Sequence, residues 1–288
     1  MYIGGIEAGG TKVNCAIGTK DGKIIEQTQF PTTAPEETTQ KMLEYFRGKE
    51  ISALGVASFG PIDVNPDSPT YGSVLDTPKQ GWAHFNLIHA LKKEIQVPIY
   101  FDTDVNGAAK AEYLWGAARG LSSCIYLTIG TGVGGGAYID GKLIHGLLHP
   151  EMGHIYVRRH PDDSYEGTCP FHKDCLEGMA AGPSVLNRLG IAGQNIPQDH
   201  EVWDFISYYL AQALVNYTMI LSPEIILLGG GVMKQHHLFP KIRKQFAELM
   251  AGYIKRNPIP NNLEQYIQFP ALGDFAGLHG SLALAIEE

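Results

Sequence analysis

Hydrophobic residues recur along the chain with two spacings, one typical of strands and one typical of helices. Residues 53–59 and 98–102 are short apolar runs of buried-strand type, whereas residues 35–48 place Met42, Leu43 and Phe46 on one helical face. Strands that alternate with helices predict an α/β fold, with ligands bound at loops beyond the strand ends. The same patterns predict further helices at 85–95, 106–116, about 201–221, about 239–255 and about 275–288, and a strand at 224–228.

Two distant segments resemble each other. Residues 2–18 and 124–139 both read as an apolar run, a Gly-rich turn and a second apolar run, and each continues into an Asp-Gly dipeptide and another β-prone run. This similarity predicts two related domains, each opening with an antiparallel β-meander. We place them at 1–118 and 119–288, with the helix at about 275–288 packing back on the first. No low-complexity linker separates them, so a cleft between packed domains is expected.

Composition and charge exclude several classes of protein. Lys plus Arg is 22 and Asp plus Glu is 30, and the net charge of −8 argues against a nucleic-acid or anionic-membrane surface. The apolar runs are far shorter than the roughly 20 residues that span a bilayer, and the N-terminal residues lack a secretory pattern. Four cysteines, two of them near a histidine, are typical of a reducing cytoplasm rather than a disulfide scaffold.

The Gly-rich turns allow more than one interpretation. Residues 130–135 match G-x-G-x-x-G, but a β-prone hairpin follows instead of the helix that a dinucleotide site needs, so we reject that assignment. Lys12 follows Thr11 rather than preceding it, which excludes a Walker A loop. Gly-Thr turns can still present backbone N–H groups to a phosphate. One such turn is better explained as a tight hairpin, but two similar turns favour phosphate binding. Gly229–Gly231, after a buried strand, could lie against a nucleotide base or ribose.

Two acids and an amide stand at the end of an expected strand, in the order Asp102, Asp104 and Asn106. An acid at this place can cap the following helix, because its oxygens accept orphan backbone N–H bonds. It can also accept the proton of a hydroxyl that attacks a phosphoryl group. The spacing alone leaves both interpretations open.

A metal site is predicted in the irregular stretch 146–182. Cys169, His172 and Cys175 form C-x2-H-x2-C, and His154 precedes them by 15 residues, which gives the four N/S ligands of a closed tetrahedral zinc site. His149 and His160 are rival fourth ligands, and free thiols with loop histidines are the alternative to a metal. We expect a structural rather than a catalytic zinc, because no open coordination position is implied.

Taken together, these motifs resemble the ROK family of sugar kinases over nearly the whole chain. Glu7–Lys12 and Leu127–Gly132 are similar to the two phosphate loops of that family, and Thr103–Asn106 is similar to the motif of its catalytic aspartate. Glu151–His154 matches E-x-G-H, and Cys169–Glu177 occupies the zinc and sugar-binding signature. The resemblance implies an actin/hexokinase-like, two-domain fold with a cleft, and a homodimer.

The resemblance also implies a role for each residue. Asp104 would be the general base, Mg²⁺ would accompany ATP, and His154, Cys169, His172 and Cys175 would hold structural Zn²⁺. The sugar-binding residues would be Asn106, Glu151, His154 and Glu177. The nucleotide-binding residues would be Gly9, Gly10, Thr11, Lys12, Gly130, Thr131, Gly132, Gly182, Gly230 and Gly231. Two residues depart from the family pattern, since His172 replaces a cysteine of the usual zinc signature and Glu7 replaces the usual Asp.

The opening residues and the chain length look most like the bacterial fructokinase branch of the family. We therefore expect an ATP-dependent fructokinase that makes fructose 6-phosphate. A kinase for mannose, glucose or an N-acetylhexosamine is a second possibility, because one sequence does not fix the sugar. A non-catalytic sugar sensor is a third, although Asp104 and the two phosphate loops count against it. A strand expected from residue 2 leaves no room for the DNA-binding segment of the family's repressors.

Overall fold

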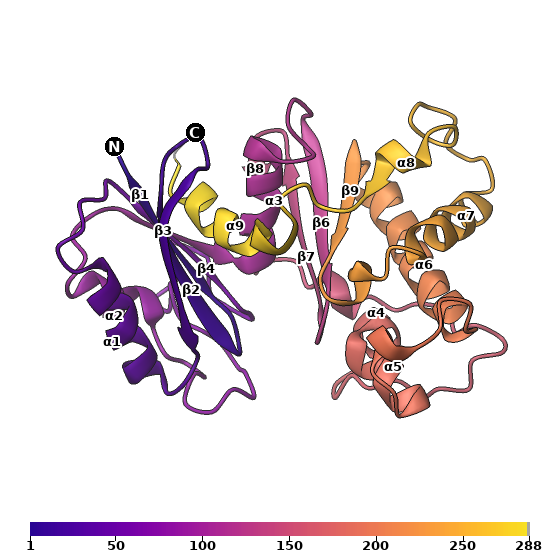
Figure 1. Ribbon diagram of the computed structural model, residues 1–288, viewed down its shortest axis with the longest axis horizontal. Helices are drawn as coiled ribbons and strands as arrows, with labels where there is room; N and C mark the ends of the chain where they lie inside the picture. Colours follow the sequence, from indigo (N-terminus) through magenta and orange to yellow (C-terminus); the bar gives the residue numbers. More distant parts are fainter. Residues whose placement is uncertain (287–288) are drawn as a thin grey trace. The chain divides into compact units, whose positions relative to one another are not determined.

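The computed structural model describes residues 1–286, and its internal contacts divide the chain into two compact units. Unit 1 comprises residues 1–120, 136–150 and the segment from Asp274 on, and unit 2 comprises residues 121–135 and 151–273. The expected C-terminal helix ends in residues 287–288, which lie outside the described residues. Figure 1 shows the chain as a ribbon, with labels on most of its helices and strands.

The first sheet begins with the predicted meander. Its strands have the order β3-β2-β1-β4-β5. β1, β2 and β3 pair antiparallel, and β4 and β5 continue the sheet in parallel from β1, which confirms the expected N-terminal meander. The strands are β1 (Ile3–Ala8), β2 (Lys12–Gly18), β3 (Ile24–Pro31), β4 (Leu54–Ser58) and β5 (Ile99–Thr103).

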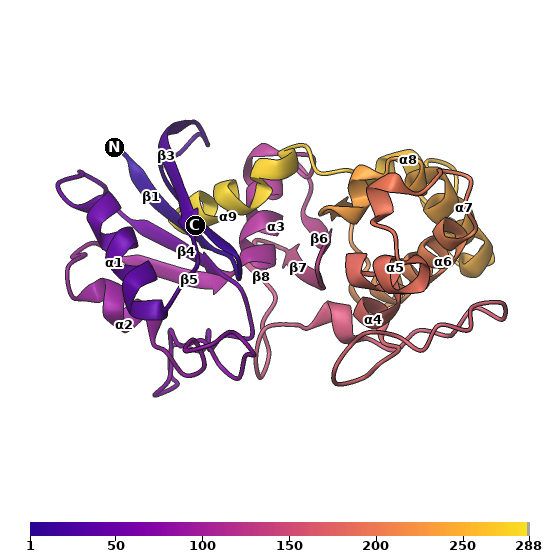
Figure 2. The same cartoon turned by 60° about the horizontal axis from the view of Figure 1, so that its bottom comes forward.

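Helices cover both faces of this sheet (Figures 1 and 2). One face carries α1 (Pro35–Phe46) and α2 (Leu87–Lys92), and the other carries α3 (Asp104–Trp115) and α9 (Ala276–Leu284). Successive residues of a strand point to opposite faces. Leu54 and Val56 of β4 accordingly join the buried cluster on the α1 face.

Helices α3 and α9 touch each other through glycines. A Cβ on Gly280 would lie 2.6 Å from the backbone nitrogen of Ala108, and a Cβ on Gly107 would lie 3.1 Å from the backbone of Gly280. The two helices therefore meet backbone against backbone. This contact fixes the start of α3, which follows directly on β5 and carries Asp104.

The second sheet has the order β10-β9-β6-β7-β8. β6, β9 and β10 run parallel to one another, and β7 pairs antiparallel with β8. All five residues of β9 are buried, as expected of a central parallel strand. The strands are β6 (Ser123–Ile129), β7 (Val133–Ile139), β8 (Lys142–Leu143), β9 (Ile225–Gly229) and β10 (Ile267–Gln268).

In unit 2 the long helix α6 packs against α7 and α4. Residues 146–182, expected to be irregular, instead contain α4 and the start of α5, and a 3-10 turn, η1 (Met152–His154). No helix within residues 1–286 is long and apolar enough to cross a membrane. The helices are α4 (Leu176–Ala180), α5 (Gly182–Leu189), α6 (Val202–Leu221), α7 (Leu238–Met250) and α8 (Leu263–Tyr266).

Candidate active site

The junction of β5 and α3 carries the predicted general base. Thr103 is the N-cap residue of α3, and its hydroxyl accepts a hydrogen bond of 3.1 Å from the backbone nitrogen of Asn106. Asp104 is the first residue of the helix and half-buried, and its Oδ1 accepts a bond of 2.9 Å from the backbone nitrogen of Val105. The capping role left open by the sequence therefore belongs to Thr103 rather than to Asp104.

Asn106, predicted to bind sugar, is buried with 1% of its surface exposed. Its Nδ2 donates a hydrogen bond of 2.8 Å to Oδ1 of Asp102, and its Oδ1 is a buried atom without a hydrogen-bond partner among the described residues. An unpaired buried amide oxygen is costly, because it loses water without gaining a donor. The start of α3 thus contains an acceptor that lacks a donor.

His145 also binds Asp102, and the sequence did not single out this pair. The Nε2 of His145 donates a hydrogen bond of 2.7 Å to Oδ2 of Asp102. This bond raises the pKa of His145 above its usual value, although burial of the imidazole opposes the shift. The two residues are 43 positions apart in the chain. The i, i+4 spacing of Asp102 and Asn106 was the only local signal for this cluster.

The first Gly-rich turn joins β1 and β2. The backbone nitrogen of Gly9 donates a bond of 3.0 Å to the carbonyl of Lys12, and Gly10, Thr11 and Lys12 are exposed. The Nζ of Lys79 donates to the carbonyl oxygen of Gly10, which ties a distant loop to the turn. The four predicted phosphate-binding residues of this turn therefore lie together at the surface of unit 1.

Glu7, at the end of β1, replaces the aspartate usual in the family. Burial raises its pKa, although a hydrogen bond of 2.7 Å from Nδ2 of Asn14 and the charge of Lys12 oppose the shift. The longer side chain fits because α9 has a glycine opposite it: a Cβ on Gly277 would collide with Oε1 of Glu7. The departure from the family pattern is thus accommodated by the facing helix.

The second Gly-rich turn joins β6 and β7 and borders a cavity of about 510 Å³. The backbone nitrogen of Gly182, at the start of α5, donates a bond of 2.8 Å to the carbonyl of Gly130. Gly230 has a φ of +87°, a conformation that favours glycine, and packs against the backbone of Ile129. The cavity lining includes four predicted nucleotide-binding residues together with apolar side chains: Gly130, Thr131, Gly182, Gly231, Pro183, Leu186, Val232 and Trp203.

Glu177, in the first turn of α4, reaches the same Gly-rich turn. Its Oε2 accepts a hydrogen bond of 3.0 Å from the backbone nitrogen of Val133. Gly132 leaves space for the carboxylate, because a Cβ there would lie 2.6 Å from Oε2. Unit 2 therefore brings a predicted sugar-binding acid and a predicted phosphate loop into contact.

The E-x-G-H motif forms the turn η1. Glu151 is exposed, and its carbonyl accepts a bond of 3.0 Å from the backbone nitrogen of His154. The glycine of the motif is required sterically, because a Cβ on Gly153 would collide with the carbonyl of Val133. Hydrogen bonding and close packing thus fix both predicted sugar-binding residues of this motif, Glu151 and His154.

The four predicted metal ligands lie together. One donor atom from each of His154, Cys169, His172 and Cys175 lies within 4.8 Å of all the others. Nδ1 of His154 is 3.7 Å from Sγ of Cys169 and 3.6 Å from Sγ of Cys175. With zinc bonds of about 2.3 Å to sulfur and about 2.0 Å to nitrogen, a tetrahedral site separates sulfur and nitrogen by about 3.5 Å. The His154–cysteine distances are therefore close to those of a zinc site, and the four side chains together form a group that could hold the ion.

The rival ligands His149 and His160 are not part of this group in the described chain. Nε2 of His149 accepts a bond of 3.1 Å from the backbone nitrogen of Ile62. Nδ1 of His160 accepts one of 3.2 Å from the backbone nitrogen of Asp162. Both imidazoles thus have other partners.

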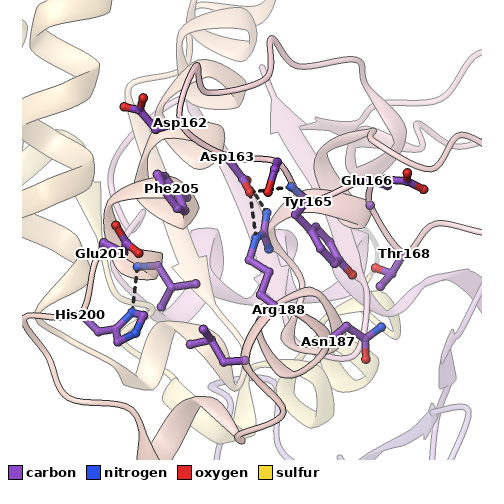
Figure 3. A pocket seen from close by; sticks show the side chains of 14 residues that line it. Asp162, Asp163, Tyr165, Glu166, Thr168, Asn187, Arg188, His200, Glu201 and Phe205 are labelled. Atoms are coloured by element: carbon purple, nitrogen blue, oxygen red, sulfur yellow. Dashed lines mark hydrogen bonds and ion pairs between the residues drawn. The ribbon is translucent and has the colours of Figure 1, made fainter.

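A larger cavity, of about 810 Å³, lies beside the loop 162–168 of unit 2 (Figure 3). Arg188 is nearly buried there, and its Nη2 lies 2.8 Å from Oδ2 of Asp163. Its guanidinium also lies over the ring of Tyr165, 4.2 Å from the centroid. The cation is therefore already paired and stacked. Among the described lining residues none is a predicted site residue, and the ion pair holds the loop to α5.

Two five-stranded mixed sheets, each with helices packed on it and with a Gly-rich β-turn, define the actin-like fold of the hexokinase class. The ROK hexokinase from Thermus thermophilus has the same fold, with a TM-score of 0.82 and 23% identity over 99% of this chain and 98% of that one. The chain belongs to the ROK family, whose model matches residues 3–288. Both the family and the fold class predicted from the sequence are confirmed.

Relatives of higher identity are fructokinases. The fructokinase of Lactococcus lactis subsp. cremoris is 48% identical over 273 residues, which are 94% of this chain and 92% of that protein. The fructokinase of Streptococcus mutans is 44% identical over 288 residues, which are 98% of this chain and 96% of that protein. These relatives belong to the branch that the opening residues predicted.

Proposed function

We propose that this chain is an ATP-dependent fructokinase that converts fructose to fructose 6-phosphate. The observation that carries the proposal is the similarity to fructokinases at 44–48% identity over nearly the whole chain. The site residues described above support it, because the motifs that resemble those of a sugar kinase are all present.

Asp104 acts as the general base. It lies in the first turn of α3, while Thr103 supplies the cap, so its carboxylate is not needed to start the helix. The hydroxyl oxygen of the sugar attacks the γ-phosphorus of ATP, and its proton passes to Asp104. The bond from the γ-phosphorus to the bridging oxygen breaks, and ADP leaves. When bound, Mg²⁺ supplies positive charge that neutralises the phosphate oxygens.

The sugar hydroxyls bind Asn106, Glu151, His154 and Glu177. The Oδ1 of Asn106 has no hydrogen-bond donor among the described residues, and a sugar hydroxyl would supply one. In His154 it is Nδ1 that faces the two cysteines, which leaves Nε2 for a hydroxyl. One imidazole can therefore serve both the metal and the sugar.

The two Gly-rich turns bind the nucleotide. The phosphates contact Gly9, Gly10, Thr11 and Lys12 of the first turn and Gly130, Thr131 and Gly132 of the second. Exposed backbone N–H groups and Thr hydroxyls in such turns suit an anion. The adenosine binds beside Gly182, Gly230 and Gly231. The partly apolar cavity of about 510 Å³ can accommodate it.

Zn²⁺ would be structural and would be held by His154, Cys169, His172 and Cys175. It would supply four bonds that tie the turn η1 to the segment before α4, and so fix Glu151 and Glu177 on either side of it. The thiol ligands and the use of ATP fit the reducing cytoplasm, which we propose as the compartment. We also propose a homodimer, to be checked by light scattering.

The test is ADP release from Mg-ATP by the purified protein with fructose, mannose, glucose or N-acetylmannosamine, against a blank without sugar. We expect kcat/KM to be highest for fructose. A higher value for another hexose would contradict the substrate while keeping the reaction. ATP consumption that no sugar stimulates would contradict the kinase assignment and favour a sugar-sensing protein.

A further inference from the structure

A buried carboxylate and a partly exposed imidazole form a pair at the start of α3. The side chain of Asp102 is 5% exposed and that of His145 is 37% exposed. Asp102 accepts hydrogen bonds from the backbone nitrogen of Thr103 at 2.7 Å, from Nδ2 of Asn106 at 2.8 Å and from Nε2 of His145 at 2.7 Å. The carboxylate thus holds the imidazole in one orientation.

The orientation of His145 leaves its second ring nitrogen for another partner. Because a carboxylate only accepts hydrogen bonds, Nε2 must carry the hydrogen that points to Asp102. Nδ1 is then the atom through which the imidazole can contact a ligand. The exposed fraction of the side chain is consistent with an open edge of the ring.

His145 also lies against the residues proposed to handle the sugar. Its Nε2 is 3.4 Å from Nδ2 of Asn106, which is itself 1% exposed. Asp104, the proposed base, is two residues from both Asp102 and Asn106. Of these two neighbours at the start of α3, the imidazole is therefore the more exposed.

We propose that His145 is a sugar-binding residue of this kinase, oriented by Asp102, and that its Nδ1 bonds a hydroxyl of the hexose beside Asp104. This inference rests on the proposed function, because it assigns a further contact to the same sugar site. Asp102 is a positioning residue, since it acts only through His145 and Asn106. The bond to Asp102 keeps the imidazole in place before the sugar arrives, so that little side-chain entropy is lost on binding.

A pair of Asp102 and His145 that served only the fold would show the same contacts. One substitution distinguishes this structural role from sugar binding. His145→Gln retains an amide nitrogen that can donate to Asp102, whereas its other polar atom, the amide oxygen, does not lie at the position of Nδ1. We expect the KM for fructose to rise about five- to tenfold, the effect of losing one hydrogen bond worth about 1 kcal/mol. We expect kcat, the KM for ATP and the thermal midpoint to stay close to those of the wild type.

The matched control is His84→Gln. His84 also pairs with an aspartate, Asp76, at 3.2 Å, but both side chains are largely exposed. This variant should have the fructose KM of the wild type. Fructose binding measured by calorimetry without nucleotide gives a second readout, in which His145→Gln should show the same five- to tenfold weakening.

An unchanged fructose KM and fructose affinity in His145→Gln would overturn the inference, and so would a loss shared equally by His84→Gln. Failure of the proposed function has a different signature, because the wild type itself would then show no fructose-dependent ADP release. The wild-type assay is therefore run first and read separately.

Discussion

Asp104 and Asp102 are two acids of one motif, but their surroundings differ, and we propose different roles for them. Asp102 is buried and accepts bonds from a backbone nitrogen, an amide and an imidazole, so its oxygens are committed within the protein. Asp104 is half-buried, and Thr103 supplies the helix cap in its place. A general base must be reachable by the substrate, so the structure favours Asp104.

Asp104→Asn tests this assignment. The amide has nearly the same shape but cannot take the hydroxyl proton, so kcat with fructose should fall by at least ~100-fold. The thermal midpoint should hardly change, because Thr103 still caps α3. Steady-state turnover and thermal unfolding of the same preparation measure both. Near-normal turnover would show that another group accepts the proton.

Local sequence predicted these residues only in part. The strand end and the acids were visible at Asp102, Asp104 and Asn106, because an Asp-x-Asp-x-Asn spacing is unusual before a helix. The contact between Asp102 and His145 was not visible, since it joins residues 43 positions apart. Such a contact depends on how β8 is placed in space, which no short-range pattern encodes.

At the scale of helices and strands, close contact in unit 1 depends on small residues. Helix α9 lies on β4 where a Cβ on Gly55 would collide with the carbonyl of Ser281. It meets α3 at Gly280 and Gly107. At these glycines the chain therefore brings backbone directly against backbone.

Gly280→Ala should destabilise unit 1. The new methyl would lie 2.6 Å from the backbone nitrogen of Ala108, and a helix backbone cannot yield as a flexible side chain can. We expect a loss of about 1–3 kcal/mol in the free energy of unfolding, measured with denaturant. Gly146→Ala is the control, because its nearest atom would be 3.9 Å away. Equal stabilities of the two variants would contradict the packing argument.

Periodicity predicted most elements but not all of their ends. The helix expected at 106–116 begins two residues earlier, at Asp104, because Thr103 provides the cap. The helix expected to reach about 255 ends at Met250, where Ala251 adopts a left-handed conformation with a φ of 49°. Periodicity did not predict helices α4 and α5, since they are short and the pattern around them is dominated by the Cys and His ligands. The formation of these two helices depends on long-range contacts.

At the scale of the whole molecule, one part of unit 2 differs from unit 1 in its regular structure. Unit 1 is built on a sheet with helices on both faces, whereas the part of unit 2 between residues 151 and 182 contains one helical turn, one short helix and the start of another. His154 near its start and Cys169, His172 and Cys175 near its end form the group that could hold a metal ion, which would cross-link this part of the chain. Because irregular chain buries little apolar surface, it gains most from such cross-links.

Removal of the metal should therefore destabilise the part of unit 2 around its ligands and leave unit 1 unchanged. We expect about one zinc per chain, and its chelation should speed hydrogen exchange in peptides from residues 151–182 while leaving those from β1 and β4 unchanged.

Cys169→Ala should have the same effect and should lower the zinc content, whereas His160→Gln should keep the metal, because His160 is not one of the ligands. Absence of zinc would contradict the ligand set. Equal exchange in the chelated and untreated protein would instead contradict the structural role, because the metal would then not be what orders Glu151 and Glu177.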